Sequence, residues 1–228
     1  MPAERPFVFI NAAMSADGKI ATIERKQTRI SGNLDFDRVD ELRASSDAVM
    51  VGIGTILSDN PSLTVKSKER REKRRAQGRD ENPVRIVVDS MARTPLDADI
   101  FKKGEGERII AVSESAPSEK VKQLAEHAEI IILGKKNAEL EKLLEELKKR
   151  GVNRLMVEGG ATLNWGMISA GLVDEIYTFI GNIIIGGTSA PTLVDGDGCI
   201  NEFCKLELIS CERLEEGVLV KWKVLGNP

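Results

Sequence analysis

The sequence predicts an α/β fold, with a central mixed and mainly parallel sheet, flanking helices and a C-terminal antiparallel hairpin. Short apolar runs alternate with helical patterns from end to end, which is typical of parallel strands joined by helices. Two apolar runs within 204–224 flank a Glu-Glu-Gly turn and indicate the hairpin. No linker or internal repeat divides the 228 residues, so we expect 1–228 to form a single domain.

The expected strands are apolar runs of strand length that end in polar or glycine-bearing turns. They cover 6–13, 47–52, 83–90, 107–113, 128–133, 152–160 and 173–181. Between them, 137–151 is the clearest helix, because leucines recur there at helical spacing. Asn137 is expected to cap its start, and Gly151 follows its end. A second helix over 34–46 is expected to turn Leu34 inward.

Composition narrows the class of protein. Hydrophobic residues make up 41% and charged residues 30% of the chain, as in globular proteins. The formal net charge of −3 does not indicate binding to nucleic acid or to a membrane surface. No apolar stretch approaches the roughly 20 residues of a membrane span, and the start, MPAERPFVF, lacks a signal-peptide layout. We therefore expect a cytoplasmic protein.

The residues that usually build metal sites and nucleophilic triads are scarce. His127 is the one histidine in the sequence, which argues against a Ser-His-Asp triad and against a two-histidine metal site. Cys199, Cys204 and Cys211 fit no zinc spacing and are expected to be reduced thiols. We expect no bound metal.

The stretch 66–82 is the one compositional oddity. It holds eight Lys or Arg against four Asp or Glu, with no apolar face beyond Ala76. A nucleic-acid patch is one interpretation, but aromatic residues are absent from it and the whole chain is acidic. A solvated helical insertion is the favoured one.

Polar, glycine-bearing turns follow several strands, where open α/β sheets bind ligands. The first strand runs into Ser15, Asp17 and Lys19 around Gly18. After 47–52, Gly52-x-Gly54 resembles a dinucleotide fingerprint, but Leu57 stands where its third glycine belongs. Thr55 and Asp59 are one helical turn apart and share a face.

Glu158-Gly159-Gly160 ends a strand just before a helix. Free N–H groups at that helix start would suit a pyrophosphate; a tight turn without ligand is the alternative. Asp89 and Ser90, with Arg93 nearby, and Ser113 follow two further strands. Each of these two strand ends could hold the ribose or the 2′-phosphate of a dinucleotide, or could form an ordinary polar loop.

Five motifs occur in order between residues 11 and 198: NAAMSADGKIA, LRASSDAVMVGIGTILSDNPSLTV, NPVRIVVDS, VEGGATLNWGMISAGLVDEIY and IIGGTSAPTLVDGDG. Together they resemble the riboflavin-biosynthesis reductase family, whose fold is that of dihydrofolate reductase. The resemblance covers nearly the whole chain and leaves 66–82 as the main unexplained segment. The stand-alone branch of the family is the closest match.

The resemblance implies an NADPH-dependent oxidoreductase of riboflavin biosynthesis, with NADH as the alternative cofactor. The reaction would reduce the ribosyl group of 2,5-diamino-6-ribosylamino-4(3H)-pyrimidinone 5′-phosphate to a ribityl chain, with hydride delivered to C1′. Nicotinamide and substrate would share one cleft, because the two reactants must lie in contact. The expected partners are this small pyrimidine ribotide and a second copy of the chain in a homodimer.

The resemblance also implies site residues. Substrate contacts fall on Arg43, Leu63, Lys66 and Glu158, with the two basic residues suited to the 5′-phosphate. Glu158 is the candidate catalytic residue; it would hold a ribose hydroxyl, hold a pyrimidine amino group or relay a proton. The turn at Asp17 would cover nicotinamide and substrate. Cofactor contacts fall on Ala13, Thr55, Asp59, Ser90, Gly160, Ala161, Thr162 and Leu163.

Other activities stay open from the sequence. The same fold could act on the deaminated pyrimidine, 5-amino-6-ribosylaminouracil 5′-phosphate, or on dihydrofolate. A non-catalytic nucleotide-binding protein is a weaker alternative. The presence of Glu158, Arg43 and Asp59 argues against an active site that has lost its function. Nucleic-acid binding through 66–82 is the weakest.

Overall fold

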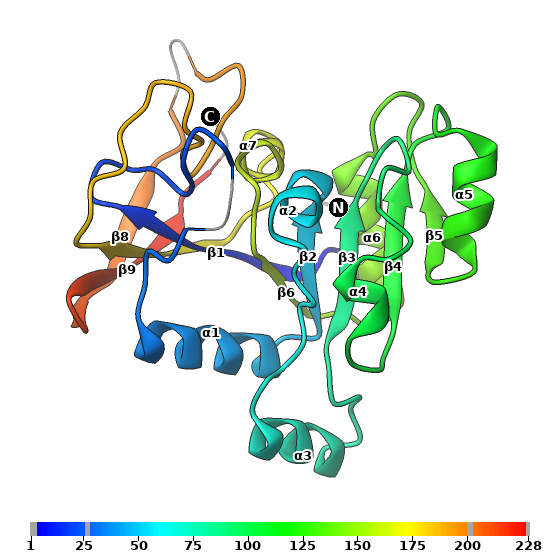
Figure 1. Ribbon diagram of the computed structural model, residues 1–228, viewed down its shortest axis with the longest axis horizontal. Coiled ribbons are helices and arrows are strands. Elements are labelled where there is room, and N and C mark those ends of the chain that lie inside the picture. The colour runs from blue at the N-terminus through cyan, green and yellow to red at the C-terminus, as the bar shows by residue number, and fades with distance from the viewer. Residues whose placement is uncertain (1–3, 26–27, 200–202, 227–228) are drawn as a thin grey trace. The chain divides into compact units, whose positions relative to one another are not determined.

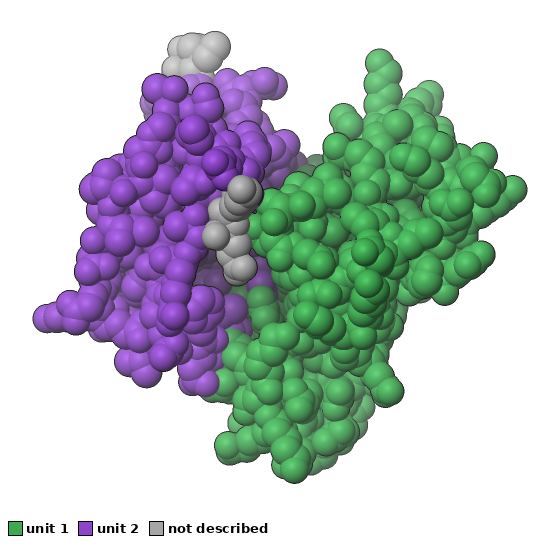
Figure 2. All heavy atoms as spheres, in the orientation of Figure 1, with its two compact units in different colours: residues 1–6, 40–156 green, residues 7–39, 157–228 purple. Residues whose placement is uncertain are grey.

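The computed structural model describes residues 4–25, 28–199 and 203–226. Strands and helices alternate along most of this length (Figure 1). The chain divides into two compact units (Figure 2). Unit 1 comprises residues 1–6 and 40–156, and unit 2 comprises residues 7–39 and 157–228.

Unit 1 is built on parallel strands, in the order β5-β4-β3-β2-β6. The pairs β2–β3, β3–β4 and β4–β5 are all parallel, and the central residues of β2, β3 and β4 are buried. This confirms the parallel arrangement that the apolar runs predict. The strands are β2 (Ala48–Gly52), β3 (Val84–Val88), β4 (Arg108–Val112), β5 (Glu129–Ile132) and β6 (Arg154–Val157), whose last residue belongs to unit 2.

The described helices of unit 1 are α2 (Ile53–Asp59), α3 (Lys68–Ala76), α4 (Asp99–Lys102), α5 (Ser118–Ala125) and α6 (Leu140–Lys149). The leucine stripe of α6 is buried as predicted, and Gly151 follows its end with φ 87°. The predicted cap is wrong: Glu139, not Asn137, is the N-cap residue, and its side chain makes no capping hydrogen bond.

Helix α1 (Asn33–Ser45) forms where expected, but it buries different side chains. Leu34 is 59% exposed, so its predicted inward position is wrong. Asp35 and Asp40 are buried instead. Each has specific donors: Arg38 donates to Asp35 at 2.8 Å, and the backbone N–H of Ser67 donates to Asp40 at 3.0 Å. Buried carboxylates need such partners.

Unit 2 contains a mixed sheet in the order β1-β7-β9-β8. Strand β1 (Phe7–Ser15) pairs in parallel with β7 (Glu175–Gly181). Strand β9 (Gly217–Val224) then pairs antiparallel with β7 and with β8 (Leu206–Leu214). This confirms the C-terminal hairpin, and with unit 1 it confirms the mixed α/β fold class. Helix α7 (Ala161–Ser169) begins directly after the glycine pair.

Two further observations bear on the composition. None of the helices formed by the described residues is long and apolar enough to span a lipid bilayer. Cys199, Cys204 and Cys211 are all free thiols, as the odd cysteine count predicts.

Candidate active site

In unit 2, the exit of β1 folds into a tight, hydrogen-bonded turn. The Ser15 hydroxyl donates to Asp17 Oδ1 at 2.6 Å and accepts the backbone N–H of Lys19 at 2.9 Å. The backbone N–H of Gly18 donates to the Ser15 carbonyl at 2.9 Å. Gly18 has φ 79°, a conformation that favours glycine. The Ser-x-Asp-Gly-Lys spacing is thus explained first by the turn itself.

The same turn binds a loop far along the chain. Asp17 accepts the backbone N–H groups of Ile185 at 3.0 Å and Gly186 at 2.7 Å. The Lys19 ammonium donates to the Ala190 carbonyl at 3.1 Å. The Ser15 hydroxyl first, and then the N–H groups of Ile185 and Gly186, lower the pKa of Asp17 from 3.8 to about 2. The carboxylate is therefore a fixed acceptor at neutral pH.

The loop 182–195 also contacts the start of α7. Asn164, fully buried, donates its side-chain amide to the Leu193 carbonyl at 2.8 Å. The Asp195 N–H donates to the Ala161 carbonyl at 3.2 Å, and Thr192 donates its hydroxyl to the Asp195 carboxylate at 2.6 Å. One loop thus connects the β1 turn with the helix start where cofactor contacts are expected.

The glycine pair lies between β6 and α7. The peptide bond Gly159–Gly160 is cis, and Gly159 has φ 100°. Gly160 is the N-cap residue of α7. The side chains of Ala161 and Leu163 are buried, so a ligand at this end would meet their backbone N–H groups, which a helix start leaves without helical partners.

The other unit 2 candidates are Glu158 and Thr162, near the glycine pair in sequence, and Ala13 on β1. Thr162 is exposed, and Glu158 is half-buried directly after β6. Ala13 is half-buried on β1, opposite Phe179 of β7.

In unit 1, two of the substrate candidates, Leu63 and Lys66, lie on the segment 60–67, and Arg43 of α1 contacts it. Lys66 donates its ammonium to the hydroxyls of Ser62 and Thr64, both at 2.8 Å. Arg43 donates to the Thr64 carbonyl at 3.4 Å. Burial and then the Arg43 charge lower the pKa of Lys66. The two basic candidates for the 5′-phosphate therefore lie at one place.

Leu63 shapes this segment. Its side chain is 1% exposed and its φ is 55°, which is unusual for a residue with a branched side chain. The backbone N–H groups of Lys66 and Ser67 both donate to the Asp40 carboxylate. The segment is thus fixed by its own backbone contacts.

Thr55 and Asp59 share one face of α2, as their spacing predicts. Both are half-buried, while Ile53 and Ile56 occupy the core side of the helix. Burial raises the pKa of Asp59. A carboxylate that is partly removed from water is costly to keep for stability alone.

Ser90 and Ser113, which follow β3 and β4, both make hydrogen bonds within the protein. The Ser90 hydroxyl accepts the backbone N–H of Ala138 at 3.0 Å, and the Ser90 carbonyl accepts the Ser113 hydroxyl at 2.8 Å. Asp89 is fully buried and accepts both the N–H and the hydroxyl of Thr94, at 2.7 and 2.8 Å. These contacts give Asp89 and Ser113 structural roles.

The model of the RibD C-terminal domain matches residues 6–220. The chain belongs to the RibD C-terminal domain family. It is 51% identical, over 95% of its length and 97% of the relative's, to the 2,5-diamino-6-ribosylamino-4(3H)-pyrimidinone 5′-phosphate reductase of Archaeoglobus fulgidus. The riboflavin-biosynthesis resemblance of the motifs is thereby confirmed.

Solved structures confirm the fold of this RibD C-terminal domain family member. A pyrimidine reductase-like protein from Corynebacterium diphtheriae superposes with a TM-score of 0.84 at 18% identity, over 97% of this chain and 93% of that one. Dihydrofolate reductase from Enterococcus faecalis gives a TM-score of 0.52 at 11% identity, over 96% and 98%. The dihydrofolate reductase-like fold is therefore established.

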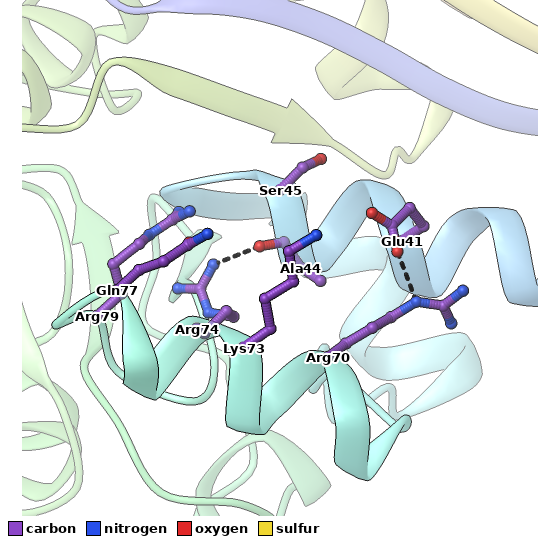
Figure 3. Close-up of a pocket in the computed structure, with 8 residues that line it drawn as sticks. All are labelled: Glu41, Ala44, Ser45, Arg70, Lys73, Arg74, Gln77 and Arg79. Carbon is purple, nitrogen blue, oxygen red and sulfur yellow. Dashed lines mark hydrogen bonds and ion pairs between the residues drawn. The ribbon is translucent and has the colours of Figure 1, made fainter.

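The charged insertion of this family member folds as a helix that packs on α1. Its α3 lines a pocket of about 240 Å³ together with the end of α1 (Figure 3). Arg74 is 4% exposed and donates to the carbonyls of Ala44 and Ser46, both at 2.8 Å. Arg79 donates to the same Ser46 carbonyl at 2.6 Å. The arginines therefore satisfy the last carbonyls of α1, so the prediction of a solvated insertion is only partly correct.

Two basic residues of the RibD-type domain were missed in the sequence. Arg85 is the second residue of β3 and is fully buried, and Lys103 follows α4, next to the Gly104 that packs against Thr64. A charged residue inside an apolar strand run is itself a signal. No sequence signal singles out Lys103, because the residues that surround it in the structure come from distant parts of the sequence.

Proposed function

We propose that this chain is the NADPH-dependent reductase of 2,5-diamino-6-ribosylamino-4(3H)-pyrimidinone 5′-phosphate, delivering hydride to C1′ of its ribosyl group to form the ribitylamino product. The observation that carries the proposal is the cluster of Arg43 and Lys66 with the hydroxyls of Ser62 and Thr64. Two cations and two hydroxyls suit a phosphate monoester. The 51% identity to a reductase named for this substrate supports the same assignment.

The start of α7 fits the pyrophosphate of a dinucleotide. A Cβ built on Gly159 would meet no atom within 4 Å, so the backbone is open on that side. The N–H groups of the first turn and the positive end of the helix dipole would meet the anion there. We assign Gly160, Ala161, Thr162 and Leu163 to this contact, together with Ala13, Thr55, Asp59 and Ser90 elsewhere on the cofactor.

The bound nicotinamide would supply the hydride. The chain's own contribution is to hold the sugar and to exclude water. Glu158 would hold a ribose hydroxyl or a pyrimidine amino group, or relay a proton to the opened sugar. The turn around Asp17 and the loop it binds would form the cover over nicotinamide and substrate.

We further propose that one domain performs this reaction in a homodimer in the cytoplasm. A single family model runs across both compact units, which supports the single domain. In the sheet order of the described residues, β8 is an edge strand next to β9, and several apolar side chains are exposed there. Leu206, Leu208, Ile209 and Val218 are exposed on the hairpin. A second copy of the chain would cover this edge.

The decisive test is oxidation of NADPH, with NADH in parallel, followed by the loss of absorbance of the reduced nicotinamide. The diamino-ribosylaminopyrimidinone phosphate, its deaminated analogue and dihydrofolate are the three substrates to compare. We expect turnover with the diamino compound. Turnover confined to the deaminated compound would keep the family and reverse the order of reduction and deamination. No turnover with any of the three, while NADPH still binds, would overturn the proposed reaction.

A further inference from the structure

A buried arginine holds the end of α4 and the loop that follows it, residues 100–106, in place. Arg85 is fully buried and donates Nη1 to the carbonyls of Lys103 at 2.7 Å and Ile100 at 3.2 Å. Its Nη2 donates to the carbonyls of Gly104 at 3.0 Å and Glu105 at 3.2 Å. One guanidinium with five donors can saturate such a ring of carbonyls. The loop therefore has a fixed path around Arg85.

This loop is joined to the segment that carries Lys66. Nη1 of Arg85 also reaches the Ser62 carbonyl at 3.4 Å. Asn82 bridges the two segments, donating to the Glu105 carbonyl at 3.0 Å and accepting the Val65 N–H at 2.9 Å. A Cβ built on Gly104 would lie 2.6 Å from Thr64 Cγ2, and its φ is 69°, so only glycine allows this approach.

Lys103 is thereby placed beside the phosphate candidates. Its charge, after burial and the Arg43 charge, contributes to the lowered pKa of Lys66. The Lys103 side chain is 60% exposed and pairs with Asp99 at 2.5 Å. Asp99 is held by its backbone N–H, which donates to Asn60 Oδ1 at 2.8 Å. Lys66 and Arg43 thus contact the stretch 62–64 directly, and Lys103 precedes the Gly104 that packs against Thr64, with the Asp99 carboxylate as a local competitor for its ammonium.

We propose that Lys103 is a third cation of the substrate-phosphate site and exchanges its contact with Asp99 for the phosphate when substrate binds. This inference rests on the proposed function and deepens it. A phosphate monoester carries about −1.5 to −2 charge at neutral pH and three acceptor oxygens. Arg43 and Lys66 alone repel each other across the site. A dianion relieves that repulsion and has acceptor capacity left for Lys103.

The test uses the full chain and ribose 5-phosphate as probe, with binding measured by calorimetry. Lys103→Ala should weaken binding about five- to tenfold, which is the loss of one charge-assisted contact at a partly exposed position. Lys102→Ala is the matched control, because Lys102 is the adjacent lysine, is 58% exposed and lies 3.8 Å from Asp97. It should stay within about twofold of the unchanged protein.

A second variant separates a ligand contact from a structural ion pair. Asp99→Asn removes the competing carboxylate, so ribose 5-phosphate should bind about two- to threefold more tightly. If Asp99→Asn weakens binding as Lys103→Ala does, the pair is structural and the inference is overturned. Equal affinities for Lys103→Ala and Lys102→Ala would overturn it as well, and so would failure of the unchanged protein to bind the probe.

The two proposals fail in different ways. If the diamino substrate is turned over but Lys103→Ala leaves its KM unchanged, the inference fails and the proposed function stands. If none of the pyrimidines is reduced but ribose 5-phosphate binding still depends on Lys103, the reaction assignment fails and the anion site stands.

Discussion

The Asp17 carboxylate accepts the backbone N–H of Gly186 at 2.7 Å, although 169 positions separate the two residues in the chain. The contact joins the exit of β1 to the loop that ends against α7. Because Asp17 also holds Ile185 and Ser15, one carboxylate fixes both the turn and the loop. A residue in a surface turn thus organises the region where we place the cofactor cover.

Replacing Asp17 with Asn should remove a pH-dependent part of the stability. The folded-state pKa is about 2, below the ordinary 3.8, so the ionised carboxylate favours the folded state. This contribution is fully present above pH 3.8 and is lost as the pH falls through about 2. Asp17→Asn cannot accept the Gly186 N–H through its amide nitrogen. Its thermal midpoint should therefore lie below that of the unchanged protein at neutral pH.

The check is a series of thermal unfolding curves for both proteins between neutral pH and about pH 2. The difference between the two midpoints should shrink as the pH falls below 3.8. A difference that stays constant over the whole range would show that the carboxylate charge plays no part.

Asp59→Asn should raise stability and lower cofactor affinity together. Burial raises the pKa of Asp59 above 3.8, so the folded state binds its proton more tightly than the unfolded chain does. The ionised carboxylate therefore costs stability at neutral pH, and this cost disappears below pH 3.8. The variant should melt higher at pH 7 but bind NADPH more weakly, a trade-off typical of functional sites.

Fluorescence titration with NADPH and thermal unfolding at neutral and low pH measure the two effects. Leu57→Ala is a suitable control, because Leu57 is 52% exposed on the same helix. Unchanged NADPH affinity in Asp59→Asn would remove Asp59 from the cofactor site.

Local patterns were sufficient for most of the fold. Apolar runs placed the strands, and Gly151 placed the end of α6, because both signals act over a few residues. They failed at α1, where Leu34 is exposed and Asp35 and Asp40 are buried. A prediction from hydrophobic periodicity places carboxylates on the solvent side of a helix. It contains no information on the backbone N–H groups after Leu63 that donate to Asp40.

The candidate site was predicted only in part, for a similar reason. Arg43 and Lys66 could be paired by family motifs, and the structure brings them to one segment. The partners of Asp17 lie 168 and 169 positions away, beyond any local pattern. Lys103 was missed because Arg85, fully buried in β3, fixes the loop that carries it.

Arg74 should be a stability residue of the charged insertion. It is 4% exposed and donates to the carbonyls of Ala44, Ser46 and Asp80. Arg74→Met would remove the Arg74 donors from all three carbonyls, of which only that of Ser46 keeps Arg79, and should lower the free energy of unfolding by about 2–4 kcal/mol. Denaturant unfolding measures this. Arg75→Met, where Arg75 is 55% exposed beside Glu81, should cost at most about 1 kcal/mol. Equal losses would refute the buried-arginine account.

Arg43→Ala should chiefly weaken binding of the phosphorylated substrate. Loss of a charge-assisted contact costs about 1.5–3 kcal/mol, which is roughly a 10- to 150-fold fall in kcat/KM. The dephosphorylated pyrimidine nucleoside should show little difference between the variant and the unchanged protein, because it lacks the group that Arg43 binds. Steady-state kinetics with both compounds test this, with Arg75→Ala as control. An unchanged KM for the phosphorylated substrate would make the phosphate assignment wrong.

Glu158→Gln should reduce turnover much more than stability. Glu158 directly follows β6 and is half-buried, so an isosteric amide should keep the fold. If its carboxylate relays a proton, kcat should fall by about 100-fold or more, with NADPH affinity unchanged. If it only holds a hydroxyl or amino group, KM should rise while kcat changes less. Kinetics on Glu158→Gln and on the exposed control Glu119→Gln distinguish the two roles. Normal kcat and KM in Glu158→Gln would exclude the proton relay, because an amide cannot take up and release a proton, and would show that any hydrogen bond to a hydroxyl or amino group does not depend on the carboxylate charge.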